Sequence, residues 1–427
     1  MADVNFSLVQ AALRTGTGTQ DFTVPGFGDP KAAIFFFTAA TTTDTVTADN
    51  LLGIGFTDGT TDGAWGIYDE DAVTTTVNEN SSVAILLKPP GSWDFAQASF
   101  SAWTTNGVTI NITSDFPSQI LCTAVLINGT DVSNVDVGRF TMSGASAVDV
   151  TSVGFNPDLV LLTCNGANAD AGSNTYGSYG IVHNGSSVTQ KGIKFFTASG
   201  AGTSAVTLRH MSAGCGGRSN DSIHELSLGT FDASGFTATP SATAFSIPYD
   251  YLALKFSNSP DIKLFEMDSP TAAESVATTG VGFQPDFGMI WTSAAQVVDS
   301  DRSSSEDGIG ITVFDGTNIY SHSVSSDDAV TTTVCKSVTA TKLDMLEGGS
   351  SHHATATFTS FDADGWTFNY SVAPGTASKW IGLAIGAAAA AGGGLTAGSL
   401  SLMGVGLSLS SFAVVIELIM RKLWQTI

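Results

Sequence analysis

Positive charge is scarce in this sequence. Its 427 residues include 16 Lys and Arg against 39 Asp and Glu, which gives a formal net charge of −23 at pH 7. A chain this acidic repels phosphate backbones, so nucleic acid is excluded as an expected partner. Charged residues make up only 13% of the chain, about half the usual share. Hydrophobic residues reach 43% and include 26 Phe, enough to fill several cores, so intrinsic disorder is not expected.

Cysteine is also scarce, with four residues and no metal-binding spacing. A chain of this length does not need disulfides to fold, so we expect buried free thiols. The positions are Cys122, Cys164, Cys215 and Cys335. The first residues lack a basic region followed by an apolar core, so no secretory signal is expected and the chain is predicted to fold in a cytoplasm.

Catalytic and cofactor motifs are missing as well. The sequence has no His-Glu-x-x-His, no Gly-x-Ser-x-Gly and no phosphate-binding Gly-x-x-x-x-Gly-Lys-Ser/Thr. Residues 53–59 contain one residue too many for a dinucleotide fingerprint. We therefore predict a protein that is not an enzyme, with no catalytic, cofactor-binding or metal-binding residues and no cofactor. A carboxylate pair assembled in space for glycoside cleavage stays open.

An internal threefold repeat is the strongest positive signal. Val-Gly-Phe-Asn-Pro-Asp at 153–158 recurs as Val-Gly-Phe-Gln-Pro-Asp at 281–286, and a looser copy lies at 25–31. The phenylalanines of these copies are 128 residues apart in both steps. A second landmark, Asp-Ala-Val-Thr-Thr-Thr-Val at 71–77, recurs unchanged at 328–334, two periods and one residue later.

The repeats predict the domain organisation. We expect a first domain with an N-terminal strand, two further repeats, and an apolar tail. Their predicted ranges are 1–145, 146–272, 273–386 and 387–427. The joins resemble one another at 135–142 and 260–267, and we expect them to be ordered strands rather than linkers.

Within each repeat the pattern is typical of β-structure. Apolar and polar residues alternate at 108–112, 309–313 and 354–358, as in half-buried strands. Asn106-Gly107 and Asp315-Gly316 are hairpin-turn pairs, because both residues tolerate positive φ. The predicted fold class is all-β, with three tandem β-sandwich repeats of the jelly-roll type, about 128 residues each.

The C-terminal tail carries no charge from Trp380 to Ile416 and is rich in Gly and Ala. About 20 apolar residues suffice to cross a bilayer, so 395–420 could contact a membrane. Its glycines, its strand-like alternation and Glu417 favour burial between copies of the chain instead. Oligomerisation and membrane anchoring both stay open.

Several polar and aromatic groups have two interpretations each. Acidic turns at 69–71, 299–301 and 326–328 are interpreted as solvated turns, with calcium binding left open. His352 and His353 follow Glu347, but adjacent strand residues point to opposite faces and would not readily share an ion. Four aromatic residues could form sugar-stacking platforms, although core packing is the expected role of most: Trp65, Tyr68, Trp93 and Trp103.

The repeats resemble modules of bacteriophage virion proteins, especially tail-fibre-like and tail-associated ones. The resemblance rests on the Gly-Phe-Asn/Gln-Pro-Asp turn, the apolar strand after it and the closing Phe-Asp-Ala-Asp/Ser-Gly at 231–235 and 361–365. The resemblance covers 20–386 and is weakest in the first repeat. It implies a virion structural protein, a tail fibre, spike or capsid-associated component, assembled in the host cytoplasm. The implied partners are further copies of the chain, other virion proteins and a host-surface glycan or receptor. The alternatives are a membrane-anchored surface or spike protein and a carbohydrate-binding module or glycan-active enzyme.

Overall fold

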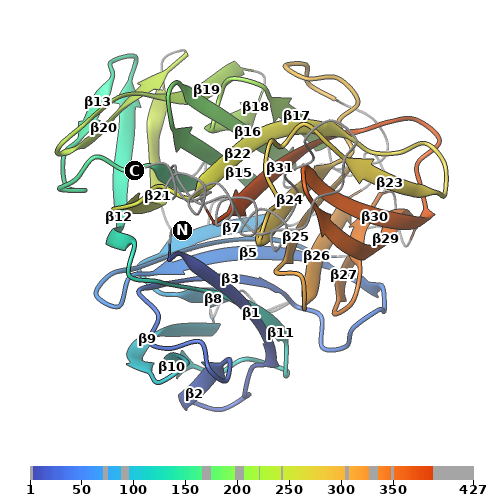
Figure 1. Cartoon of the computed structure of the whole chain (residues 1–427), viewed down its shortest axis with the longest axis horizontal. Coiled ribbons are helices and arrows are strands. Elements are labelled where there is room, and N and C mark those ends of the chain that lie inside the picture. Colours follow the sequence, from blue (N-terminus) through green and yellow to red (C-terminus); the bar gives the residue numbers. More distant parts are fainter. Residues whose placement is uncertain are drawn as a thin grey trace, which may run out of the picture. The chain divides into compact units, whose positions relative to one another are not determined.

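The computed structural model describes residues 3–70, 76–87, 96–165, 175–197, 206–220, 222–241, 244–302, 307–326, 335–347 and 351–387. Residues 2–388 form one compact unit, and the predicted tail at 387–427 lies almost wholly outside the described residues. The described part is all-β and contains six antiparallel sheets arranged as β-sandwiches (Figure 1). This confirms the predicted all-β class.

Sandwich 1 packs a six-stranded sheet on a four-stranded one. The larger sheet has the order β1 (Asn5–Ala12), β11 (Leu121–Asn128), β3 (Ala32–Thr38), β5 (Asn50–Thr57), β6 (Asp62–Asp69) and β7 (Thr76–Ser81); the smaller has β2 (Gly18–Thr23), β10 (Gly107–Ser114), β9 (Ala96–Thr104) and β8 (Ile85–Leu87). Asn106 at the β9–β10 turn has a φ of 71°, as its hairpin signal predicts.

Sandwich 2 repeats this arrangement. Its larger sheet has β12 (Val132–Gly144), β21 (Ala244–Phe256), β14 (Leu159–Asn165), β15 (Thr175–Asn184), β16 (Val188–Thr197) and β17 (Val206–Met211); its smaller sheet has β13 (Val148–Val150), β20 (Gly235–Pro240), β19 (Ser222–Asp232) and β18 (Gly216–Asn220).

Sandwich 3 has the same order with one addition. Its larger sheet has β22 (Asp261–Asp268), β31 (Lys379–Gly386), β24 (Phe287–Ser293), β25 (Asp307–Phe314), β26 (Ile319–Ser326) and β27 (Cys335–Thr339), followed by β4 (Thr47–Ala48); its smaller sheet has β23 (Ser275–Thr278), β30 (Gly365–Val372), β29 (His352–Asp362) and β28 (Leu343–Leu346). The added β4 comes from the first repeat, so one sheet crosses the repeat boundary.

The two predicted joins are ordered strands, and each one opens a sandwich. β12 pairs with β21, and β22 pairs with β31, the last strand of its own repeat. The predicted boundaries at 145/146 and 272/273 therefore separate each first strand from its sheet. By strand pairing, the chain passes from one sandwich to the next at 129–131 and at 257–260. The sequence similarity between 135–142 and 260–267 arises because β12 and β22, which hold nearly all of these residues, are the equivalent first strands of sandwiches 2 and 3.

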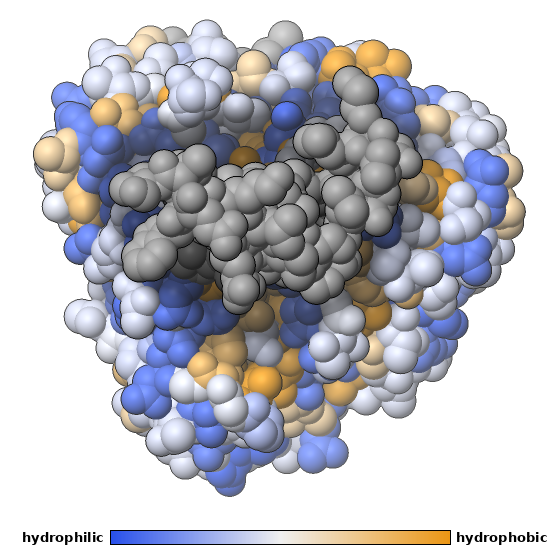
Figure 2. All heavy atoms as spheres, viewed as in Figure 1, coloured by the Kyte–Doolittle hydropathy of each residue, from blue (hydrophilic) through white to orange (hydrophobic). Residues whose placement is uncertain are grey.

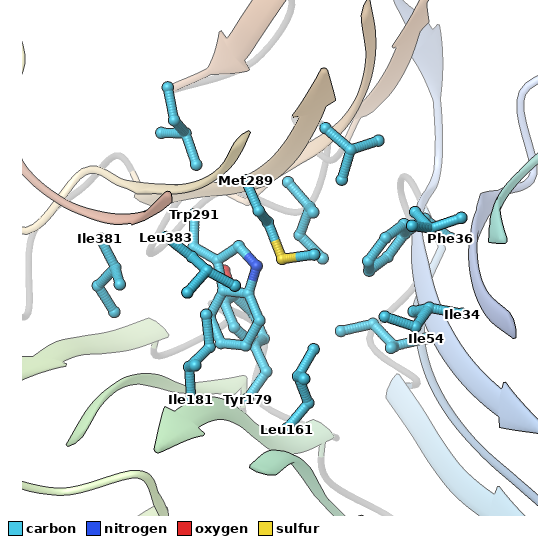
Figure 3. Packing of buried hydrophobic residues seen from close by; sticks show 14 of the residues in the cluster. Ile34, Phe36, Ile54, Leu161, Tyr179, Ile181, Met289, Trp291, Ile381 and Leu383 are labelled. Carbon is cyan, nitrogen blue, oxygen red and sulfur yellow. The ribbon is translucent and has the colours of Figure 1, made fainter. Parts of the chain in front are cut away.

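The inner strands of the larger sheets, such as β3 and β24, are buried on both faces. Along β3, Ala32, Ile34 and Phe36 join a core shared by all three sandwiches, whereas Ala33 and Phe35 face the core of sandwich 1. Figure 3 shows the shared core, where Ile34, Leu161 and Trp291 come from the three different repeats. Continuous burial explains the unbroken apolar runs at the start of each repeat, because neither face of these strands meets water.

Candidate functional site

Several buried titratable side chains lie where two sandwiches meet. We name these contacts the 1–2, 2–3 and 1–3 interfaces after the sandwiches that form them. Among the described residues, the buried titratable side chains discussed below lie at these interfaces and in two polar clusters inside sandwich 3.

Asp250 of β21 is the buried charge of the 1–2 interface. Its carboxylate accepts hydrogen bonds from Arg139, at 2.7 Å from Nε and 3.1 Å from Nη2. Gly63 of β6 faces it from sandwich 1, where a Cβ would lie 3.3 Å from Asp250 Cγ. Burial raises the pKa of Asp250 to about 6, although Arg139 and Asn80 favour the charged form.

Glu266 of β22 contacts three basic side chains of the 2–3 interface. Its carboxylate lies 3.6 Å from His210 Nε2, 3.7 Å from Lys191 Nζ and 3.8 Å from Lys379 Nζ. His210 lies on the edge strand β17 and is fully buried. Burial lowers the pKa of His210 to about 4, against the attraction of Glu266.

The acidic turn at 299–301 also belongs to the 2–3 interface. Asp299 accepts a hydrogen bond from the Ser212 amide at 2.9 Å, and its own amide donates to His210 O at 2.8 Å. Asp301 pairs with Arg209 at 3.4 Å. The three residues of this turn are exposed, as the interpretation of a solvated turn predicts, and its two carboxylates also bind sandwich 2. Asp71, Asp327 and Asp328 of the other acidic turns lie outside the described residues.

The 1–3 interface combines strand pairing with buried polar contacts. β4 pairs with β27, and Lys336 of β27 donates to Asp49 O at 3.2 Å. His322 Nε2 lies 2.8 Å from Thr123 Oγ1, and Ser326 Oγ donates to Asp69 Oδ2 at 3.4 Å. Asp69, predicted in a solvated turn, is instead buried against sandwich 3.

Asp344 of β28 forms the first cluster inside sandwich 3. It is 1% exposed and accepts hydrogen bonds from Ser337, from Thr355 at 3.2 Å and from Ser323 at 3.4 Å. His352 Nδ1 lies 2.7 Å from Asp344 Oδ1, and this hydrogen bond raises the pKa of His352. The buried carboxylate thus joins β26, β27, β28 and β29.

Replacing Asp344 with Ala should cost about 3 kcal/mol of unfolding free energy, because the hydroxyls and His352 lose their buried acceptor. Since the folded pKa of His352 is raised, its contribution is complete below about pH 6.5 and is lost as the pH rises through the folded pKa. Urea unfolding between pH 6 and 9 checks both points, and His352→Gln should flatten the pH profile. Asp149→Ala, which removes an exposed Asp–Thr pair, is the matched control and should cost less than about 0.5 kcal/mol. Equal losses for the two aspartate variants would contradict the assignment.

Ser378, His353 and Glu347 form the second cluster. His353 Nε2 lies 3.2 Å from Ser378 Oγ, His353 Nδ1 contacts Glu347, and Arg302 donates to Glu347 Oε1 at 2.8 Å. This order of serine, imidazole and carboxylate is that of a hydrolase triad.

Two properties of this cluster favour a structural role. Ser378 is 0% exposed, and its Oγ also accepts from Trp380 Nε1 at 3.0 Å and contacts Ser269 Oγ at 3.1 Å. These contacts leave little room for an attacked carbonyl carbon beside Oγ. Burial and Arg302 lower the pKa of His353 to about 4, well below the value that suits a general base near neutrality.

The two adjacent histidines therefore have different partners, as their predicted opposite faces require. Among the described residues there is no group of three or more His, Cys, Asp or Glu placed to hold a metal ion. Trp65 and Tyr68 are core residues, and Trp103 packs against the core of sandwich 1. Trp93 lies outside the described residues.

Cys122, Cys164 and Cys215 are buried free thiols, as predicted.

The visible surface offers no broad apolar platform outside its grey atoms. On the face in Figure 2, hydrophobic residues lie in small groups between hydrophilic ones. The large hydrophobic side chains that are exposed among the described residues are Val188, Val297 and Val372. In the part of the chain that the structure describes, no helix is long and apolar enough to cross a bilayer.

Comparisons with known proteins add little to this picture. No family model matches the chain, and no curated protein matches it. The solved structure of the LG1-3 region of the laminin alpha2 chain aligns with 88% of this chain and 96% of that one, at 8% identity and a TM-score of 0.10. A TM-score this low carries no argument about fold or function.

Proposed function

We propose that the chain is a non-enzymatic structural component of a bacteriophage virion, a tail fibre, spike or capsid-associated protein assembled in the host cytoplasm. The observation that carries this proposal is the core shared by the three sandwiches. Three sandwiches that share one core suit a stiff particle component, because they are packed against one another and are not joined only by flexible linkers. The resemblance of the repeat motif to virion modules supports the same reading, with each repeat a jelly-roll-like module.

The polar chemistry of the described residues fits this role. Arg139–Asp250, Glu266 with Lys191, and Lys336–Asp49 all lie within or beside contacts between sandwiches. The charged groups thus serve the architecture. Further copies of the chain, other virion proteins and a host-surface glycan or receptor are the proposed partners.

Assembly through the tail predicts a change in mass. In detergent-free buffer, the full chain should form a soluble trimer or larger oligomer, and a chain ending at Ala387 should be a monomer. This end point keeps the hydrogen bond from the Ala387 amide to Asp286 Oδ2, so the last strand stays intact. Analytical ultracentrifugation provides the measurement. A full chain that is soluble only in detergent would overturn this proposal and favour a membrane anchor.

The absence of enzymatic activity can be tested at Ser378. A fluorophosphonate probe, which labels activated serines, should leave Ser378 unmodified in the folded protein because its Oγ is enclosed. Peptide mass spectrometry after labelling is the readout, with urea-unfolded protein as the control for intrinsic reactivity. Labelling of the folded protein that disappears in His353→Gln would reveal a working triad and refute the non-enzymatic assignment.

Virion location has its own test. The protein should co-purify with phage particles through a density gradient and a subsequent salt wash. Mass spectrometry of its peptides in the purified particles detects it. Their recovery only in the soluble fraction of the lysate would contradict a structural role in the particle.

A further inference from the structure

The 1–3 interface is held together without a direct chain connection. The chain passes from sandwich 1 to 2 at 129–131 and from 2 to 3 at 257–260, so sandwiches 1 and 3 meet only through non-covalent contacts. Besides the β4–β27 pairing, these include Phe6 stacked on Phe287 at 4.5 Å and the Leu8 amide donating to Asp315 at 3.3 Å. Among the three interfaces, this one can open with the fewest constraints on the rest of the chain.

His322 lies inside this interface with one neutral partner. It is 1% exposed, and Thr123 Oγ1 lies 2.8 Å from its Nε2. Thr123 Oγ1 also accepts from Gln10 Nε2 at 3.1 Å, which leaves its own hydrogen for His322 Nε2. On this assignment Nε2 is the acceptor and Nδ1 carries the proton, buried and without a partner in the described structure.

Among the residues that the structure describes, no carboxylate lies close enough to the imidazole to offset a positive charge. On the strands beside β26, Lys336 of β27 pairs with Asp49 of sandwich 1, and Asp315 sits at the β25–β26 turn, bound to the Leu8 amide. Asp69 of β6 accepts from Ser326 at the far end of β26. Burial alone accordingly lowers the pKa of His322 to about 3.

The other two interfaces respond to acid differently. His210 in the 2–3 interface has Glu266 at 3.6 Å, with Lys191, Lys379 and Asp299 around it, and its sandwiches are joined by the chain. Asp250 in the 1–2 interface has a raised pKa, so protonation in mild acid relieves a cost of burial there. Acid should therefore weaken the contacts of sandwich 3 while the 1–2 interface holds.

We propose that the 1–3 interface is an acid-labile joint, which opens when His322 takes up a proton while sandwiches 1 and 2 stay packed together. The sign follows from linkage: a histidine whose folded pKa is lowered contributes fully above its unfolded value of about 6.5 and loses that contribution as the pH falls toward 3. One proton gained on opening multiplies the ratio of open to closed molecules by up to about tenfold per pH unit in this window. Between pH 6.5 and 4.5 the ratio should rise about fiftyfold, because half of the open molecules are already protonated at pH 6.5.

Hydrogen exchange with peptide mass spectrometry tests the joint in the full chain. Rates at pH 7.5, 5.5 and 4.5, corrected for the intrinsic pH dependence, should rise in acid for peptides covering β4 and β27, whose pairing crosses the interface, and stay protected for peptides covering β14 and β21. His322→Gln, which cannot titrate, should remove most of that rise. Because the readout is the change with pH within one variant, a general loss of stability does not imitate it.

His210→Gln is the matched control, a buried histidine at the neighbouring interface. It should leave the acid response of β4 and β27 in place. If His210→Gln abolishes that response while His322→Gln retains it, or if all peptides lose protection together, the proposal is wrong. Should His322→Gln fail to fold at pH 7.5, His322→Phe poses the same question, and an unchanged acid response there would equally overturn the proposal.

Discussion

Replacing Gly180 with Ala should destabilise the protein by about 3 kcal/mol or more. Gly180 lies on β15, where the Cys215 carbonyl at the edge of the opposite sheet approaches closely; a Cβ would lie 1.8 Å from that oxygen. Backbone cannot rotate away as a side chain can, so the two sheets of sandwich 2 would have to separate. Urea unfolding followed by far-UV circular dichroism measures the loss, because sandwich 2 contains no tryptophan.

Gly229→Ala is the control for this experiment. Gly229 lies on β19 of the same sandwich, and a Cβ there would meet nothing within 4 Å. Removing a strand glycine in open space should be neutral or slightly stabilising. A Gly180→Ala protein as stable as Gly229→Ala would show that the two sheets of sandwich 2 do not approach as described.

The same close approach occurs once in each sandwich. Gly55 faces the Ala84 carbonyl and Gly308 faces the Leu346 carbonyl, each at 1.7 Å from the Cβ position. The alanine substitution should therefore be equally costly at all three positions. These glycines are hard to single out in a sequence that contains 46, because the carbonyl each one faces lies about 30 to 40 residues away.

The fold class followed from local patterns, whereas the packing of the repeats did not. Alternation and hairpin turns are properties of neighbouring residues, and the 128-residue period is visible when the sequence is compared with itself; together they led to antiparallel strands in three copies. The apolar run at 33–37 predicted a buried strand but not what covers each face. Its outer face packs in the shared core with Leu161 and Met289, more than a hundred residues away.

The polar clusters likewise depend on contacts between distant segments, which local sequence patterns do not predict. Glu347 and His353 were noticed as neighbours in sequence, but Ser378 and Arg302, which complete their network, come from other strands and loops of the repeat. His322 had no sequence signal beyond its residue type. Its position against Thr123 depends on the closure of sandwich 3 on sandwich 1, which no local pattern encodes.

The shared core leads to the second large prediction: at pH 7.5, where the 1–3 interface is closed, the three repeats should unfold as one unit. A fragment ending at 258 would lack sandwich 3 and uncover Ile34 and Phe36 together with Tyr179, which packs edge-on against Trp291 at 4.4 Å between ring centroids. Exposure of such an apolar surface should make the fragment aggregate or bind a hydrophobic dye strongly. Calorimetry of the chain ending at Ala387 should show a single transition.

Aggregation of the fragment could also reflect its low solubility alone, so a test in the intact protein is needed. The Trp291→Ala variant provides it. Trp291 is 1% exposed, and its removal should cost about 3 to 5 kcal/mol. If the repeats are coupled, that loss lowers the midpoint of the whole transition, including the tryptophan fluorescence of sandwich 1 and the exchange signals of sandwiches 1 and 2. Val372→Ala, at an exposed site of sandwich 3, should leave the midpoint nearly unchanged. Three transitions, of which Trp291→Ala moves only one, would mean that each sandwich is stable by itself and that the shared core contributes little to the stiffness on which the proposed virion role depends.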